Sequence, residues 1–344
     1  MKLIQQSSRK QATRFLWSLG LSGVLALTGC QGAIDDTREA IPVSEDFDVQ
    51  GHRGARGLKP ENTLPAFEVA LDLGVTTLEL DLHYTADGHV VVWHDPVIEP
   101  DKCGLDDGAP ESAPDPDDPG TRRARAIAAL RLDQLKWFRC DRNPDPGGQP
   151  DQESSTTALA GDDFGIVTLA GLFEFVEAYS TSEEKTDGQR ANATRVRFNV
   201  ETKRQPDDPG AIGDEFNGIE AGAFELALLD LVDRFQLKDR IIVQSFDHRS
   251  LWVIHALDSS IRLAALTSSS PGDLEVLAAK GASIWSPRAS ILTEQQITDA
   301  HNAGLEVVPW TVNSPIEMAR LISLGVDGII TDRPDLLLDQ LGQR

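Results

Sequence analysis

The chain has 344 residues, 40% of them hydrophobic and 25% charged, a composition typical of a globular protein rather than a disordered one. Its 55 acidic and 32 basic residues give a formal net charge of −23, which argues against binding to nucleic acid and, by charge alone, to anionic lipid. If the substrate is an anion, positive charge must be concentrated at the site that binds it.

The N-terminal segment indicates export. A basic start is followed by an apolar run that is too short for a comfortable membrane span and ends in the tetrapeptide LTGC at Cys30. That tetrapeptide resembles the bacterial lipobox, whose cysteine is lipidated and becomes the first residue after cleavage. We predict a lipoprotein signal peptide over 1–29, a polar tether over 30–45, and an exported protein anchored by lipid to a bacterial membrane, with Gln31 favouring the outer membrane and periplasm. The alternatives are an uncleaved anchor and a signal peptide with a chance cysteine.

Cys103 and Cys140 form an even pair in a protein expected to be exported, and we predict a disulfide between them. Such a bridge would stabilise the fold by ~4 kcal/mol, because it limits the unfolded chain. Two free buried thiols or a metal-binding pair are the alternatives, and no further His or Cys nearby supports a metal.

Short β-rich runs alternate with helical stretches from residue 46 to residue 344. The expected strands are 48–52, 76–82, 195–201, 240–246, 261–266, 283–286, 305–310 and 328–331. The expected helices are about 63–73, 169–180, 219–235, 248–257, 272–280, 294–303, 315–324 and 334–341. This alternation predicts one α/β domain, a (β/α)8 TIM barrel. An open doubly wound sheet is the alternative, but no G-x-G-x-x-G follows a strand.

Two segments depart from the alternation. The stretch 83–95 contains Asp87-Gly88 between β-rich runs, which predicts a small hairpin. Residues from about 97 to 165 are polar and rich in Pro, Gly and Asp around an expected helix over 129–138. We predict a long insertion after the second strand that loops over the barrel mouth rather than a separate domain. A second polar loop is expected over 182–195.

The second expected strand has leucines on one face and Glu79 and Asp81 on the other. The two carboxylates lie about 7 Å apart at the Cα level and would repel each other. Burying either of them unpaired would cost several kcal/mol, so a cation between them is expected. Oxygen ligands favour Mg²⁺ or Ca²⁺. A structural ion pair with Arg or Lys is the alternative.

The third strand repeats this anomaly. In RVRFNVETK, apolar side chains alternate with Arg197, Asn199, Glu201 and Lys203 on the opposite face. Glu201 adds a third carboxylate at the end of a neighbouring strand, and Lys203 adds a positive charge beside it. Charged residues on the inner faces of two adjacent strands indicate a site rather than a core.

Histidines end two of the expected strands. His52 ends the first strand and His94 ends the hairpin, and each alone would more often be a structural histidine. Together, beside a carboxylate cluster, they suit a general acid and a general base. Arg53 can grip two phosphate oxygens, and Gly54 permits a sharp turn. The remaining histidines look like surface or helix positions and are given no role: His83, His89, His248, His255 and His301.

The combination of a divalent cation, an arginine, a lysine and two histidines favours hydrolysis of a phosphodiester. The cations would bind the anion and stabilise its added charge, while the imidazoles move protons. In this hypothesis one histidine activates the nucleophile and the other protonates the leaving alkoxide. The nucleophile is either water or a hydroxyl of the substrate itself, attacking through a cyclic phosphate.

Taken together, these motifs resemble a known family. The sequences HRG, PENT, ELD, TADG and HD follow, in order and spacing, the pattern of the glycerophosphodiester phosphodiesterases, and ETK, QSF, WTVN and GIITDRP continue it. The resemblance covers about residues 47–340 and is loosest in the insertion. It implies a TIM barrel over 46–344 that releases glycerol 3-phosphate from small molecules such as glycerophosphocholine or glycerophosphoethanolamine, with one divalent cation.

The resemblance also implies roles for individual residues. It makes Glu79, Asp81 and Glu201 the metal ligands, His52 and His94 the acid/base pair, and Arg53 and Lys203 the phosphate contacts. Trp310 would form an apolar wall for the substrate, or else serve only as a large core residue. Glu61 would support His52 and Arg53 or begin the first helix, which Asn62 and Thr63 would cap. Asp332 would hold the last barrel loop.

Two alternative functions would be expected to leave different features in the sequence. Related barrels cleave sphingomyelin or lysophospholipids and often have apolar entry loops, whereas the insertion here is polar. A non-catalytic surface-binding lipoprotein would be expected to lack a ligand or a histidine of the motif, and none is missing.

Overall fold

The computed structural model describes residues 41, 43, 44 and 46–343, so the predicted signal peptide, Cys30 and most of the tether lie outside the described residues. Among the residues that are described, no helix is both long enough and apolar enough to cross a membrane.

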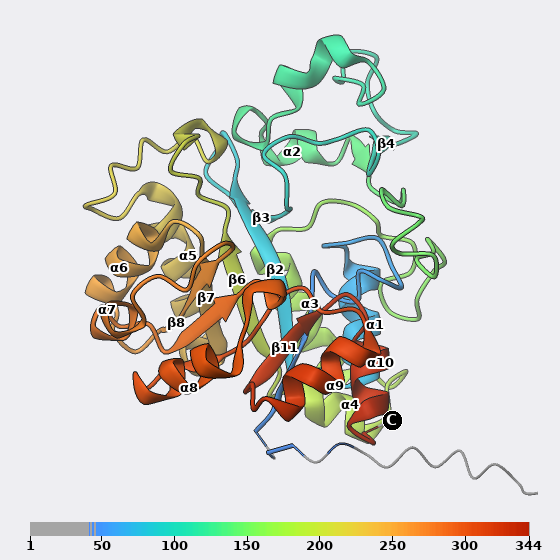
Figure 1. The fold of residues 1–344 in the computed structure, drawn as a ribbon. Helices are drawn as coiled ribbons and strands as arrows, with labels where there is room; N and C mark the ends of the chain where they lie inside the picture. Colours follow the sequence, from blue (N-terminus) through green and yellow to red (C-terminus); the bar gives the residue numbers. More distant parts are fainter. Residues whose placement is uncertain (1–40, 42, 45, 344) are drawn as a thin grey trace, which may run out of the picture. The chain divides into compact units, whose positions relative to one another are not determined.

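Parallel strands form a barrel at the centre of residues 46–343 (Figure 1). They are β1 (Asp48–Gly51), β2 (Thr77–Tyr84), β6 (Arg197–Thr202), β7 (Ile241–Ser245), β8 (Arg262–Thr267), β9 (Ile284–Pro287), β10 (Glu306–Val307) and β11 (Gly328–Thr331). Their order in the sheet is β10-β9-β8-β7-β6-β2-β1-β11. Backbone hydrogen bonds from the amides of Asp327 and Ile330 to the carbonyls of Val307 and Pro309 join the two ends of the sheet. The predicted (β/α)8 barrel is confirmed.

Helices connect the successive strands, and a last helix follows β11. They are α1 (Leu64–Leu73), α3 (Leu169–Thr181), α4 (Asp187–Ala193), α5 (Ala223–Arg234), α6 (His248–Leu257), α7 (Leu274–Ala279), α8 (Glu294–Asn302), α9 (Pro315–Ser323) and α10 (Pro334–Gln340). The prediction of a polar loop over 182–195 was wrong, because α4 lies within it. A capping box between Thr186 and Gln189 starts this short helix, a signal that the polar composition obscured.

The inner and outer faces of the strands have different partners. Outward residues such as Leu78, Leu80 and Leu82 of β2 belong to the large core between barrel and helices. Inside the barrel, one half of the sheet is apolar and includes Ile242, Ala264, Ile284, Val308 and Ile330. The other half, on β1, β2 and β6, is polar.

A chain of amides fills the polar half of the barrel interior. Asn199 Nδ2 donates to Gln50 Oε1 at 2.7 Å and lies 3.2 Å from Gln244 Oε1. Gln244 Nε2 in turn donates to Glu79 Oε1 at 2.6 Å. Because each amide is fixed by its neighbour, this chain holds the Glu79 carboxylate in one orientation.

The hairpin and the insertion follow β2. Strand β3 (Val90–Val92) pairs antiparallel with β2, as the Asp87-Gly88 turn predicts. The insertion contains β4 (Gly104–Leu105), α2 (Leu132–Leu135) and β5 (Phe138–Arg139), and β4 pairs with β5. The helix predicted over 129–138 is thus limited to one turn. The 3₁₀ turns of the described chain include Pro119–Arg125, Ile127–Ala129, Pro209–Ala211, Lys238–Arg240 and Ala289–Ile291.

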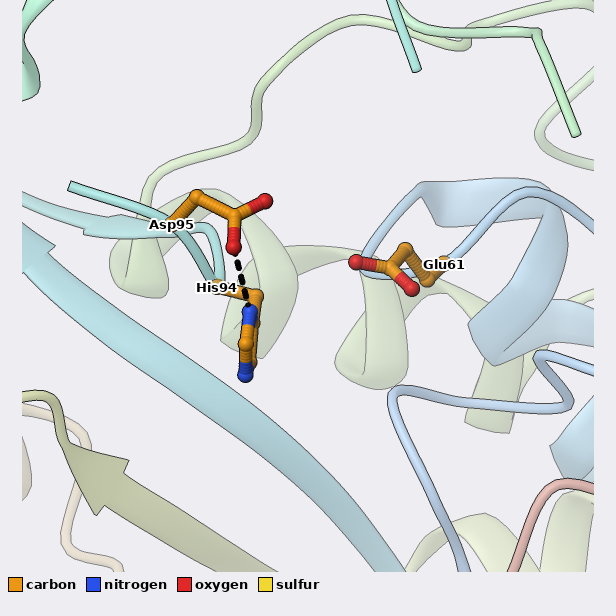
Figure 2. A group of neighbouring side chains, drawn as sticks. All are labelled: Glu61, His94 and Asp95. Carbon is orange, nitrogen blue, oxygen red and sulfur yellow. Dashed lines mark hydrogen bonds and ion pairs between the residues drawn. The ribbon is translucent and has the colours of Figure 1, made fainter. Parts of the chain in front are cut away.

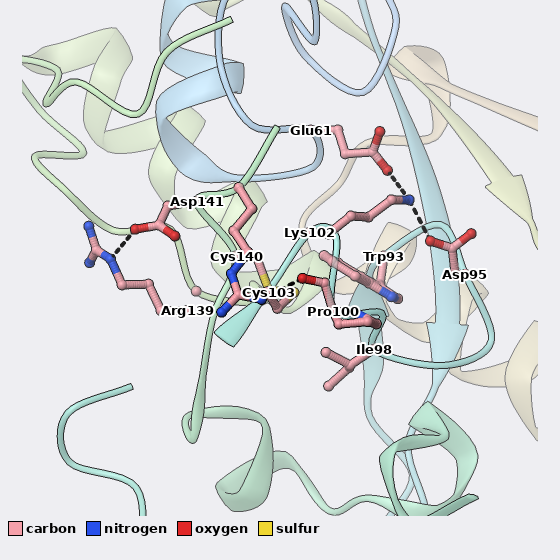
Figure 3. The surroundings of a disulfide bond; sticks show 12 residues. Glu61, Trp93, Asp95, Ile98, Pro100, Lys102, Cys103, Arg139, Cys140 and Asp141 are labelled. Atoms are coloured by element: carbon pink, nitrogen blue, oxygen red, sulfur yellow. Dashed lines mark hydrogen bonds and ion pairs between the residues drawn. A yellow bond between two sulfur atoms is a disulfide. The ribbon is translucent and has the colours of Figure 1, made fainter. Parts of the chain in front are cut away.

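The insertion has a small core of its own that is continuous with the hairpin. Val91 and Trp93 of the hairpin pack with Ile98, Ile127, Leu130, Leu135 and Phe138 of the insertion. Cys103 and Cys140 belong to the same cluster and are joined by a disulfide (Figure 3). This core includes Trp93, the residue before His94, so the insertion is anchored directly beside a predicted site residue.

Candidate active site

Most of the predicted site residues line one cavity of about 120 Å³ at the carboxyl ends of the barrel strands. Its lining is His52, Arg53, Glu79, His94, Glu201, Lys203, Gln244, Phe246, Leu266, Trp310, Thr311 and Ile330. Asp81 is buried beside it on β2, and Glu61 bonds to its Arg53. A larger groove outside the barrel, about 280 Å³ and lined by Phe173, Phe198 and Arg240 among others, has no histidine or carboxylate cluster.

Three buried carboxylates converge beside the cavity. Glu79, Asp81 and Glu201 each present an oxygen, and these oxygens lie within 4.8 Å of one another. Neighbouring strands β2 and β6 place them there, since Asp81 lies directly opposite Glu201 in the sheet. Asp81 Oδ1 is buried without a hydrogen bond, although Lys203 Nζ lies 3.4 Å away. An oxygen-rich cluster with an unpartnered buried oxygen fits a divalent cation such as Mg²⁺ or Ca²⁺.

The electrostatics of this cluster also fit a cation. Burial raises the pKa of Glu79 well above its usual value, and repulsion from Asp81 and Glu201 adds to the effect. Burial also raises the pKa of Glu201, with Lys203 only partly offsetting it. The pKa of Asp81 lies well below its ordinary value, because Lys203 and Arg53 outweigh the effect of burial. Lys203 Nζ also lies 2.8 Å from Glu201 Oε1, so two positive side chains are shared among three buried carboxylates.

A tight turn after β1 places Arg53 between these groups. Arg53 has φ +51° and its backbone amide donates to Glu79 Oε2 at 2.9 Å. Its guanidinium Nε lies 3.1 Å from Asp81 Oδ2, and its Nη1 donates to Glu61 Oε1 at 2.8 Å. Gly54 follows with φ +86°, and a Cβ there would come within 2.6 Å of the backbone of Ala66 in α1. Only glycine permits this approach.

The PENT segment beside the turn has two separate roles. Thr63 caps α1 by accepting from the amide of Ala66, as predicted. Asn62 does not cap the helix; it has φ +58°, and its Nδ2 donates to Asp81 Oδ2 at 2.9 Å. Asparagine tolerates this left-handed backbone better than most residues, which allows its side chain to reach the carboxylate cluster.

His52 is oriented by Asp332 on the loop after β11. Its Nδ1 lies 2.5 Å from Asp332 Oδ1, while Nε2 faces the carboxylate cluster, 3.9 Å from Glu79 Oε2. The other oxygen of Asp332 accepts from Gln149 and Asn313, each at 2.6 Å, and from Arg56 at 3.2 Å. Asp332 therefore does more than hold the last loop, which was the role predicted for it.

His94 is oriented by the residue that follows it. Its Nδ1 lies 2.8 Å from Asp95 Oδ1 (Figure 2). Beneath it, His83 Nε2 lies 3.1 Å from the His94 carbonyl oxygen. The interpretation of His83 as a surface or helix residue was wrong: it is a fully buried residue of β2, and burial lowers its pKa to about 4. Neutral His83 thus supports the backbone at His94.

Both pocket histidines have lowered pKa values. Burial is the main cause for His52, opposed chiefly by Asp332. Burial is also the main cause for His94, and the positive charge of Arg53 adds to it. Each ring has one nitrogen held by a carboxylate and the other free to meet a ligand, an arrangement that suits proton transfer.

Trp310 lines the opposite part of the cavity. Its Nε1 donates to the carbonyl of Ser286 at 2.9 Å, which fixes the ring. Phe246 contacts this ring edge to face, with ring centres 5.4 Å apart. The guanidinium carbon of Arg288 lies 5.4 Å from the centre of the Trp310 ring. The half-buried Trp310 and the 39% exposed Phe246 give the cavity an apolar wall beside its charged one.

Comparison with known proteins assigns the chain to a family. The model of the glycerophosphoryl diester phosphodiesterase family matches residues 52–336. The chain belongs to this family. It is an enzyme of the phosphoric diester hydrolase class, and the reaction of the family is hydrolysis of glycerophosphodiesters to glycerol 3-phosphate. Members typically depend on a divalent metal, and the cluster of Glu79, Asp81 and Glu201 could hold one.

Individual relatives are similar over most of the chain. A glycerophosphodiester phosphodiesterase of Bacillus altitudinis is 28% identical over 293 residues, which cover 83% of this chain and 95% of that one. One of Caldanaerobacter subterraneus is 25% identical over 295 residues, covering 85% and 96%. A solved structure assigned to the same family, from Silicibacter pomeroyi, has a TM-score of 0.67 at 26% identity and covers 86% of this chain and 92% of that chain.

A further solved structure shares the fold. It is a phosphodiesterase of Oleispira antarctica in complex with the product sn-glycerol-3-phosphate. Its TM-score is 0.62 at 20% identity, and the match covers 86% of this chain and 96% of that one.

Proposed function

We propose that the protein is a metal-dependent glycerophosphodiester phosphodiesterase that acts on water-soluble substrates such as glycerophosphocholine and glycerophosphoethanolamine. The observation that carries this proposal is the convergence of a carboxylate cluster, two cationic side chains and two carboxylate-bound histidines on one small cavity. A cavity of about 120 Å³ suits a compact anionic group better than an acyl chain.

Glu79, Asp81 and Glu201 would hold one divalent cation, Mg²⁺ or Ca²⁺. When bound, such an ion supplies Lewis-acid charge to a phosphoryl oxygen. Arg53 and Lys203 would bind the phosphate, and both are held protonated: the surrounding carboxylates, Glu61 foremost for Arg53 and Glu201 for Lys203, raise their pKa values despite burial. These positive groups concentrate charge for an anion in a chain whose formal net charge is −23.

His52 and His94 would move the protons. As the new P–O bond forms, one imidazole takes the proton of the attacking hydroxyl, from water or from the glycerol itself. As the P–O bond to the alcohol breaks, the other imidazole gives its proton to the leaving oxygen. Since Nδ1 of each ring is bound by an aspartate, Nε2 is the atom available for transfer. Trp310 and Phe246 would contact the carbon skeleton of the substrate.

The charged side chains that line the small cavity, together with a formal net charge of −23 that disfavours nucleic acid, favour a small-molecule substrate. For location, the LTGC sequence supports export and lipidation at Cys30, with anchoring to a bacterial membrane on the periplasmic or outer-membrane side. Labelling of the cysteine by radioactive or alkyne palmitate in cells, lost in a Cys30→Ala variant, would test that part of the proposal.

The activity is tested with full-length protein in detergent and glycerophosphocholine as substrate. Release of glycerol 3-phosphate should stop after chelation and return with Mg²⁺ or Ca²⁺. Glu79→Gln should abolish the release, whereas the matched change at exposed Glu111, Glu111→Gln, should not alter it. Cleavage of lysophosphatidylcholine in preference to glycerophosphocholine would favour the lysophospholipid alternative, and full activity in the chelated protein would contradict the metal dependence.

A further inference from the structure

A second group of metal-ligand side chains lies beside the proposed site. Glu61, His94 and Asp95, the three residues drawn in Figure 2, present atoms within 4.8 Å of one another. Such a trio could hold a cation, but protein cations already contact its carboxylates. Glu61 accepts from Arg53 Nη1 at 2.8 Å and from Arg56 Nε at 2.6 Å. Because these two guanidinium groups already neutralise the Glu61 carboxylate, a metal ion is not needed there.

Lys102 of the insertion completes this neutralisation. Its Nζ donates to Glu61 Oε1 at 2.7 Å and also to Asp95 Oδ2, so one ammonium bridges the two carboxylates (Figure 3). The side chain is 12% exposed, and its Nζ lies 5.7 Å from the ring centre of Trp93. Arg53 and Lys102 hold the pKa of Glu61 well below its ordinary value despite burial. The ammonium group of Lys102 thus occupies the position between the two carboxylates that a metal ion would take.

The backbone around Lys102 is fixed from several directions. Cys103, the next residue, is bonded to Cys140, and both are buried in the small core that includes Trp93. The carbonyl of Lys102 accepts from the amide of Arg142 at 3.1 Å. The strand pairing of β4 with β5 continues directly after the disulfide. A disulfide, a strand pairing and a backbone hydrogen bond therefore constrain the insertion at the point where Lys102 reaches the site.

We propose that Lys102 is a positioning residue for His94 and that the Cys103–Cys140 disulfide sets its place. Lys102 fixes one oxygen of Asp95, which leaves the other oxygen to bind His94 Nδ1 and direct Nε2 into the cavity. Without the ammonium, Asp95 and Glu61 lose their shared cation, and Asp95 can turn away from the ring. This inference rests on the proposed acid/base function of His94.

The charge of Lys102 is tested with Lys102→Met, which keeps a chain of similar length over Trp93 but removes the ammonium. We expect kcat for glycerophosphocholine to fall about three- to tenfold, with little change in KM, because the proton-transfer group is misplaced while the phosphate contacts stay. Lys102→Arg, which keeps the positive charge, should retain much of the wild-type kcat. Lys136→Met, the same change at an exposed lysine of the insertion, should have no effect.

The contribution of the disulfide is tested by a double-mutant cycle. Cys103→Ala/Cys140→Ala should lower kcat, and combining it with Lys102→Met should cause little further loss, because both changes act through the same ammonium. Fully additive losses would show that the disulfide acts elsewhere and would overturn its assigned role.

A spectroscopic readout separates this inference from the proposed function. The ¹⁵N signals of the His94 ring, assigned by their loss in His94→Ala, should shift in Lys102→Met, while those of His52 should not. Unchanged His94 signals, or an unchanged kcat of Lys102→Met beside an active wild type, would overturn the positioning role. An inactive wild type with a shifted His94 signal would instead refute the proposed function and leave the positioning contact standing.

Discussion

His52 and His94 face the same cavity, but different parts of the molecule fix their orientation. The partner of His52 is Asp332, 2% exposed, on the loop after β11 of the barrel. The partner of His94 is Asp95, 23% exposed and bound by Lys102 of the insertion. Asp332 accepts from Gln149, Asn313 and Arg56 as well, so losing one donor leaves others. Asp332 is thus held by barrel residues as well as by Gln149 of the insertion, whereas Asp95 is held by Lys102 of the insertion, so the two histidines of the proposed acid/base pair should differ in how far they depend on the insertion.

Removing either ring should have the largest effect in this comparison. We expect His52→Ala and His94→Ala each to lower kcat by roughly 10²–10⁴-fold, the usual contribution of a general acid or base. The measurement is steady-state release of glycerol 3-phosphate at saturating metal. His89→Ala, at a 48% exposed histidine of the hairpin, is the matched control and should retain full activity. A His52→Ala variant as active as the control would remove His52 from the mechanism.

Replacing the aspartate partner of each histidine should lower kcat to different extents. Asp332→Asn should lower kcat by about a hundredfold, since an amide can favour the wrong tautomer of the buried His52. Asp95→Asn should lower kcat by only about tenfold, because His94 is more exposed and solvent can partly replace the lost contact. Both values come from kcat on the same substrate. A larger loss for Asp95→Asn than for Asp332→Asn would reverse the comparison.

Acid should weaken the fold through the same two aspartates. The pKa of Asp332 is held well below its ordinary value, chiefly by His52 and Arg56, although burial opposes this. The pKa of Asp95 is lowered to about 2, chiefly by His94 and Lys102, again against burial. Because both folded pKa values lie below the unfolded value of about 3.9, the stability they contribute is present above about pH 4 and is lost as pH falls.

The smallest expected effect follows from these pKa directions. The free energy of unfolding from urea titrations should fall between about pH 4 and pH 2 through Asp95. Asp95→Asn should make this fall shallower, and Asp332→Asn should do so more strongly. Wild-type and variant curves that run parallel over this range would show that neither carboxylate is linked to folding as described.

The sequence predicts the barrel and the groups that break its apolar pattern. Glu79, Asp81 and Glu201 stand out because buried strands rarely contain carboxylates, and His52 and His94 stand out at the ends of apolar runs. These signals are local and follow from the two-residue period of a strand. They allow the candidate site to be located before any tertiary structure is known.

The partners that orient these groups could not be predicted. Asp332 meets His52 only because β1 pairs with β11, and their separation along the chain is 280 residues. Lys102 and Gln149 lie in an insertion without hydrophobic periodicity, so no pattern indicates which side chains reach the cavity. His83 continues the alternation of β2, and that period was the one signal that could have placed it inside the barrel.

The division of labour between the two histidines is tested most directly by changing the leaving group. The measurement compares kcat of His52→Ala and His94→Ala on glycerophosphocholine with kcat on a glycerophosphodiester of 4-nitrophenol, whose departure needs no proton. We expect one of the two variants to recover most of its activity on the nitrophenyl substrate, because it lacks only the general acid, while the other stays slow. Equal losses of both variants on both substrates would contradict a mechanism in which one histidine is the acid and the other the base.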